Sequence, residues 1–187
     1  MKARCLALLL VLAAAAAVAG CGSGDSSDSS ANAGTSAKEP TRKFEAGKVI
    51  NGCRIEPRTK CLGADLHHAI VEDARLELAN LTKANLSGAI MPRAIFSGAT
   101  LLGANLSGAN MNQAFLNGAN LSDANLSDAN LSGAKLGGAM LHGANLRGTS
   151  LYEADLNHAY VGRANLSDAR FCHTTMPDKS INNSGCP

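Results

Sequence analysis

The chain has 187 residues, with 17 Lys or Arg against 15 Asp or Glu, so its formal net charge is +2. A surface that imitates the phosphates of nucleic acid needs a strong charge of one sign. The near balance of charges therefore argues against that class and against a nucleic-acid partner.

Residues 1–20 have the features of an export signal. Lys2 and Arg4 precede an apolar stretch that is too short for a stable membrane-spanning helix. The last residues, Val18-Ala19-Gly20-Cys21, resemble a bacterial lipobox. The resemblance implies cleavage before Cys21, attachment of lipid such as palmitate to its sulfur, and anchoring to the bacterial cell membrane outside the cytoplasm. The alternative is a secreted protein in which Cys21 occurs by chance.

Residues 21–40 are expected to form the lipidated Cys21 and a disordered tether. The tether has no apolar side chain larger than alanine, and its composition is typical of disorder. The following segment, 41–62, is predicted to form an N-terminal cap. It is basic over residues 42–60, which favours a solvated surface, with weak contact to anionic lipid as the alternative.

A strict five-residue period runs through residues 63–171. Alanine fills 21 of 22 slots from Ala64 to Ala169, with Thr149 as the exception. The slot two residues later holds Leu 16 times and another apolar residue otherwise. Five residues advance about 140° around a helix, and an odd period alternates faces in a strand. The chain must therefore turn once per repeat, as in a solenoid.

Stacking the repeats tests how many form one coil. With four per coil, an outward column reads Asp65 followed by Asn at 85, 105, 125, 145 and 165, and its inward neighbours from 66 to 166 are all Leu. With three per coil the columns are mixed. Four repeats per coil are therefore predicted, with an Asn column able to hydrogen-bond between coils. The corner residues include Asp, Asn and Arg as well as Gly, so the turn is not expected to demand a positive φ everywhere.

These A(D/N)LxX units resemble the pentapeptide repeat family. The resemblance covers residues 64–171 and implies an all-β fold, a right-handed quadrilateral β-helix of about 5.5 coils. Such a stack would be roughly 25 Å long at the usual strand spacing.

Four cysteines remain after the signal and Cys21. One pair precedes the solenoid and one follows it, too far apart for cross-pairing. We therefore predict the disulfides Cys53–Cys61 and Cys172–Cys186, which hold an N-terminal cap and a C-terminal cap at 172–187.

No catalytic residues, metal site or cofactor are expected. The five histidines lie at scattered positions of the repeat and are interpreted as surface residues. Apolar residues replace Asp or Asn in the outward column and are the candidate partner contact. In the predicted register they stack in three pairs: Ile70 with Ile90, Ile95 with Phe115, and Met140 with Tyr160. Exposed apolar clusters often mark contact surfaces. The alternative is that residues 44–62 cover the strip.

The sequence thus favours a non-enzymatic, membrane-anchored scaffold that binds an unknown protein partner, with a homodimer as one possibility. The family resemblance implies an alternative, a DNA mimic that inhibits or protects DNA gyrase. Residues 63–171 carry seven basic and nine acidic groups, a net charge of only −2, which is weak for phosphate mimicry. A hydrolase or transferase with a surface groove is the third and least favoured class.

Overall fold

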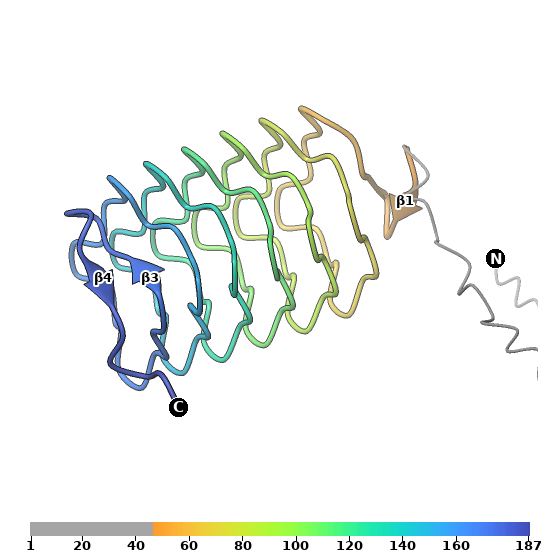
Figure 1. Cartoon of the computed structure of the whole chain (residues 1–187). Coiled ribbons are helices and arrows are strands. Elements are labelled where there is room, and N and C mark those ends of the chain that lie inside the picture. Colours follow the sequence, from red (N-terminus) through yellow and green to blue (C-terminus); the bar gives the residue numbers. More distant parts are fainter. Residues whose placement is uncertain (1–46) are drawn as a thin grey trace, which may run out of the picture. The chain divides into compact units, whose positions relative to one another are not determined.

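The computed structural model describes residues 47–187 of the chain. By its internal contacts the chain divides into Met1–Glu39 and Pro40–Pro187. The predicted export signal, Cys21 and the tether lie outside the described residues. The described part of the second unit is a stack of similar coils that follow one another along the chain (Figure 1).

Parallel β-bridges hold the coils together. Each bridge joins residues twenty positions apart, from Lys60↔Asn80 at the first coil to Asp155↔Thr175 at the last. This is the spacing that the column comparison predicts. The bridges extend slightly beyond the repeat limits of 63 and 171. Residues 47–187 contain no helix, and so none that could cross a membrane.

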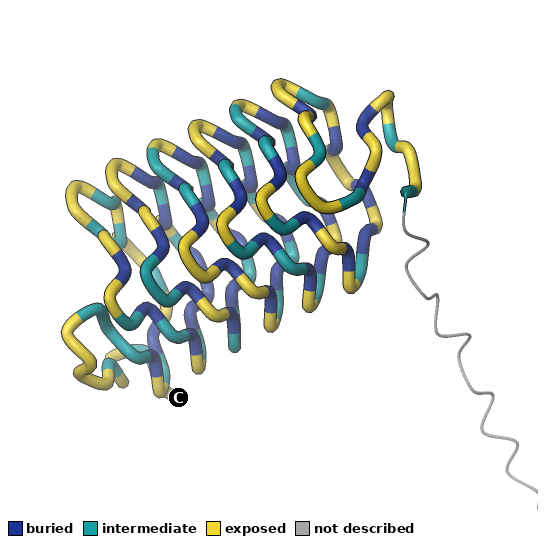
Figure 2. The backbone as a smooth tube through the Cα atoms, turned by 90° about the horizontal axis from the view of Figure 1, so that it is seen from above, coloured by how far each residue is buried: buried dark blue, intermediate teal, exposed yellow. Residues whose placement is uncertain are grey.

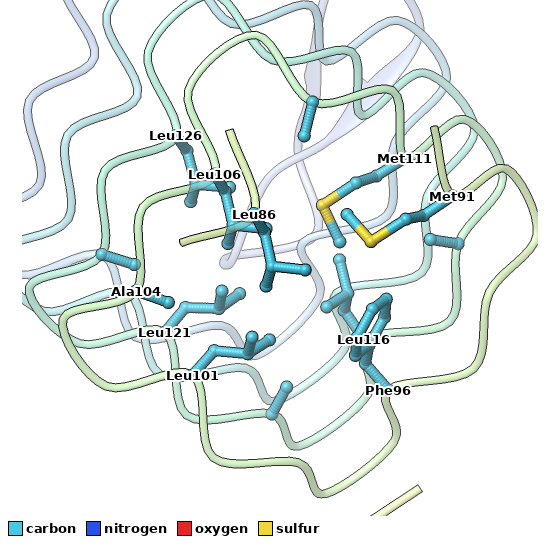
Figure 3. Packing of buried hydrophobic residues seen from close by; sticks show 14 of the residues in the cluster. Leu86, Met91, Phe96, Leu101, Ala104, Leu106, Met111, Leu116, Leu121 and Leu126 are labelled. Atoms are coloured by element: carbon cyan, nitrogen blue, oxygen red, sulfur yellow. The ribbon is translucent and has the colours of Figure 1, made fainter. Parts of the chain in front are cut away.

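The repeated Ala and Leu residues point inward and form the core. Buried and exposed positions alternate along every coil (Figure 2). Leu86, Leu106 and Leu126 follow one another in a single interior file (Figure 3), and each is at most 1% exposed. Burying a Leu side chain contributes roughly 1.5 to 3 kcal/mol before conformational entropy is counted. The five-residue period therefore places two apolar side chains per repeat, Ala and Leu, in the interior.

The Asn column forms a continuous ladder of side-chain amides. Asn85 Nδ2 donates to Asp65 Oδ1 at 3.0 Å, and the four later amides each donate to the Asn one coil earlier, at 3.1 to 3.4 Å. Each of these oxygens also accepts the backbone N–H two residues on, for example Ser107 N to Asn105 Oδ1 at 3.2 Å. The predicted inter-coil bonding is confirmed. The ladder has one direction, and the Asp65 carboxylate is its final acceptor.

The corners correct one expectation. The corner residue has a positive φ throughout the stack, including non-glycine residues such as Asp123 and Arg163, with φ of 57° and 59°. Each corner is closed by a turn bond such as Ala109 N to Leu106 O at 3.1 Å. A positive φ at the third residue of such a turn is the type II pattern. The expectation that the turn does not demand a positive φ everywhere was wrong, because bonds between coils, such as Asp123 N to His142 O at 2.9 Å, outweigh the local strain.

A hairpin and a disulfide lie at each end of the stack. Strands β1 (Val49–Ile50) and β2 (Cys53–Arg54) pair antiparallel at the N-terminal end, and β3 (Thr174–Thr175) and β4 (Ile181–Asn182) pair antiparallel at the other. The disulfides join Cys53 to Cys61 and Cys172 to Cys186, with Cα atoms 5.4 and 4.8 Å apart. This is the pairing that the sequence predicts.

Candidate functional site

The six apolar residues of the candidate contact form three bridged pairs. The bridges join Ile70 to Ile90, Ile95 to Phe115, and Met140 to Tyr160. The pairs belong to three different columns, so the structure gives three short strips in place of one site. Ile95 is half-buried, and the other five are exposed, from 38% for Ile90 to 67% for Tyr160.

The strips of Ile70 with Ile90 and of Ile95 with Phe115 lie on either side of one corner. Asp73 and Arg93 occupy that corner and form a two-bond ion pair, with both N–O distances 2.8 Å. The hydrogen bonds from Arg93 lower the pKa of Asp73, against a smaller opposite effect of burial. Because the two charges neutralise one another, the corner between the two apolar strips carries little net charge.

The alternative that residues 44–62 cover these strips fails for the part that the structure describes. Residues 47–62 lie in the hairpin and the first coil, where Lys48 Nζ donates to Ile70 O at 3.4 Å. Phe115 nevertheless stays 42% exposed and Ile90 38% exposed. The cap reaches the edge of the first strip, and the second strip remains uncovered by it. Residues 44–46 lie outside the described residues.

Sequence reasoning missed three exposed leucines. Leu62, Leu78 and Leu102 are exposed and occupy corner positions. Leu78 has a φ of 57°. Its Cδ2 lies 2.7 Å from the position that a Cβ on Gly98 would occupy. The available signal was a large aliphatic residue in corner slots that mostly hold Gly or polar residues.

The histidines do not gather into one site among residues 47–187. His67 Nδ1 lies 2.8 Å from Asp65 Oδ1, and this contact is the main cause of the lowered pKa of Asp65. His173 lies beside Cys172 and Cys186, whose sulfur atoms are joined to each other. These cysteines are therefore not thiolates that could bind a metal ion.

The C-terminal end of the stack is only partly closed. Leu156 N bonds to Thr175 O at 2.8 Å and Gly185 N bonds to Phe171 O at 2.7 Å. The equivalent N–H groups of Val161 and Leu166 have no acceptor within residues 47–187. The C-terminal hairpin thus closes one part of the last coil and leaves an open backbone edge over residues 160–169.

Comparison with known proteins agrees with this geometry. A family model described as "Pentapeptide repeats" matches residues 59–98, 99–138 and 129–168. A search of curated proteins found no match.

Solved structures of repeat proteins are also similar. HetL, a pentapeptide repeat protein involved in heterocyst differentiation regulation from the cyanobacterium Nostoc sp. strain PCC 7120, is 35% identical over 67% of each chain, with a TM-score of 0.56. Rfr23 from the cyanobacterium Cyanothece 51142 is 28% identical over 59% of this chain and 85% of its own, with a TM-score of 0.34. QnrB1, a plasmid-mediated fluoroquinolone resistance protein, is 18% identical over 62% of this chain and 64% of its own, with a TM-score of 0.28.

The family model covers more than half of the chain, and members of this family fold as right-handed β-helices. The chain belongs to the pentapeptide repeat family.

Proposed function

We propose that this protein is a non-enzymatic scaffold, anchored through lipid on Cys21 to the outer face of a bacterial cell membrane. Its right-handed, four-sided β-helix of about 5.5 coils would present flat faces to a protein partner. The lipobox resemblance and the tether composition support the anchor. The exposed apolar pairs support the contact.

The main evidence for a partner contact is that Phe115 is exposed, although the interior of the stack is filled by other side chains. Phe115 occupies an outward position where most repeats have a polar residue, and it is 42% exposed. Its backbone is fully bonded, with Phe115 N to Ala94 O at 2.9 Å and Phe96 N to Phe115 O at 2.7 Å. The side chain is therefore not needed to hold the stack together. Its exposed apolar surface is unfavourable in water, and a partner that covered it would gain binding free energy.

Crosslinking in intact cells tests this contact. Phe115→Asp should remove a crosslinked product that the unchanged chain gives, while Asn110→Asp, one outward position away in the same part of the stack, should keep it. Loss of the product in both variants, or in neither, would contradict a contact at Phe115. A product of twice the chain mass would identify the partner as a second copy.

The gyrase alternative gains little from the structure. Mimicry of DNA requires a strong and continuous negative surface. Residues 63–171 carry a net charge of only −2, and some of their acidic groups are paired with arginines, as in Asp73 with Arg93 and Asp168 with Arg147. Inhibition of DNA gyrase by the purified protein would restore this alternative.

A further inference from the structure

We propose that the N-terminal end of the β-helix docks on the anionic lipid surface of the membrane, so that the stack stands on its first coil. The inference rests on the proposed lipid anchor and adds an orientation to it. Four exposed basic residues and two exposed aliphatic residues carry it. They are Lys48, Arg54, Arg58, Lys60, Val49 and Leu62.

The basic residues are concentrated in one short segment. Residues 47–62 contain four basic side chains and one acidic side chain, Glu56, a net charge of +3 in a protein whose repeats carry −2. Glu56 lies 3.9 Å from Arg54. Within residues 47–187, Arg58 and Lys60 make no ion pair, so their charges are available to an anionic surface.

Acidic residues of the first coil cancel only part of this charge. Asp65 bonds to His67, Glu77 bonds to Arg75 at 2.8 Å, and Asp73 bonds to Arg93. Glu72 is the remaining carboxylate of that coil. Arginines pair with Glu77 and Asp73, which leaves the carboxylates of Asp65 and Glu72 against the net +3 of residues 47–62. The end therefore keeps a small excess of exposed cations.

Aliphatic side chains accompany these cations. Val49 in β1 is 56% exposed and Leu62 in the first coil is 61% exposed, although Ile55 of the same segment is buried and Ile50 is partly buried. Basic side chains beside exposed aliphatic ones are the combination that binds the interface of an anionic bilayer. A cap that faces only water would gain from exposed charges, but it would gain nothing from exposed aliphatic side chains.

The anchor makes weak docking sufficient. The tether that the sequence predicts would span about 25 to 30 Å over the 26 residues from Cys21 to Gly47. A tethered group experiences its target at an effective concentration on the order of millimolar. Each basic side chain near an anionic surface strengthens binding about fivefold. The N-terminal end, which follows the tether in the chain, is thus the end best suited to bind the lipid surface.

Fluorescence quenching by lipid tests the orientation. The mature chain carrying Leu62→Cys is labelled on its added thiol and reconstituted into vesicles that contain spin-labelled lipid. The vesicles are either zwitterionic or about one-third phosphatidylglycerol, a content high enough for polybasic binding. We expect strong quenching on the anionic vesicles alone. Leu102→Cys is the matched control, because it lies in the same column two coils away and should be quenched on neither.

Charge reversal provides the second arm. Arg54→Glu with Arg58→Glu and Lys60→Glu should weaken docking by at least about a hundredfold, and quenching at residue 62 should fall to the level seen on zwitterionic vesicles. Reversal of Arg147, Arg163 and Lys179, at the other end of the stack, should leave it unchanged. Equal quenching at residues 62 and 102 would show that the stack lies on its side and would overturn the proposal.

Radioactive palmitate on the same preparation separates this proposal from the anchor. A chain that carries palmitate but is not quenched at residue 62 would overturn the docking alone. A chain without palmitate that is still quenched on added anionic vesicles would overturn the anchor alone. A chain with neither property would overturn both.

Discussion

Thr149 fills a slot that holds alanine in all the remaining repeats, and its side chain is fully buried. Its Oγ1 donates to Leu126 O at 2.7 Å, one coil earlier. Thr174, also fully buried, makes the same bond to Leu151 O at 2.6 Å. A buried hydroxyl group costs little when it is bonded. The slot therefore accepts a threonine because a carbonyl oxygen of the preceding coil lies within its reach.

Glycine corners allow the cost of positive φ to be separated from the cost of a clash. Gly138 and Gly143 have φ of 66° and 68°. A Cβ on Gly138 would meet nothing within 4 Å, whereas a Cβ on Gly143 would lie 2.4 Å from Asp123 Oδ1. We expect Gly138→Ala to lower the free energy of unfolding by about 1 kcal/mol through φ alone. Gly143→Ala should cost more, because Asp123 must also move. Urea unfolding with intact disulfides measures both, and equal losses would contradict the clash.

The ion pair between Asp73 and Arg93 should make stability depend on acid pH. Bonding to Arg93 lowers the pKa of Asp73 in the folded protein. Its contribution to the free energy of unfolding is therefore present above the unfolded value of about 3.9, and is lost as pH falls through the lower folded value. Thermal unfolding between pH 7 and pH 2 should show a smaller acid loss for Asp73→Asn than for the unchanged chain. Asp123→Asn, which removes a carboxylate with no ion pair in the described residues, is the control. An unchanged acid slope in Asp73→Asn would contradict the prediction.

At the scale of the coil, the Leu files and the amide ladder are two parts of one register. Each twenty-residue coil brings Leu onto Leu inside and Asn onto Asn outside. A shift of one repeat would break both the interior packing and the ladder. The Asp65 carboxylate accepts the first amide of the ladder and has no donor of its own. The interior Leu packing and the outer amide ladder therefore both specify the register of the coils.

The interior file gives the clearest mutational test of this register. Leu106 is fully buried, and Leu102, four residues earlier, is 38% exposed at a corner. Leu106→Asp would place an unpaired charge in the core, which costs at least several kcal/mol. We expect that variant to fail to accumulate as folded protein, whereas Leu102→Asp should fold normally. Circular dichroism and protease resistance of the two purified variants measure this. Comparable folding of both would contradict the inward placement of Leu106.

The period allowed the coils to be predicted, because an apolar residue every fifth position must point into one interior. The disulfide pairs could be predicted because the stack keeps the two cysteine pairs at opposite ends. The corner backbone could not be predicted. Residues such as Arg93 are poor candidates for positive φ by themselves, and bonds between coils, here Arg93 N to Asn112 O at 2.8 Å, explain their conformation. The hairpins β1–β2 and β3–β4 were also not evident, since two-residue strands carry almost no sequence pattern. The outward position of Phe115 and its separation from the Met140 pair followed from the predicted register, but its exposure did not, because the sequence left open whether residues 44–62 cover it.

At the scale of the whole molecule, the two ends differ. The N-terminal end combines exposed cations with Val49 and Leu62, and its first coil receives bonds from Lys48 and Asn51 in the hairpin region. The C-terminal end has an open edge over residues 160–169 beside exposed Tyr160. A molecule held at one end by lipid would present its long faces and its open end to the surroundings. Both proposals therefore depend on the anchor at Cys21.

Metabolic labelling with radioactive palmitate tests that anchor most directly. The unchanged chain and Cys21→Ser are expressed in the same bacterium, purified and compared for label per protein. The account predicts label on the unchanged chain in the membrane fraction and none on Cys21→Ser. Equal label on both chains, or an unlabelled chain recovered free of the membrane, would contradict it.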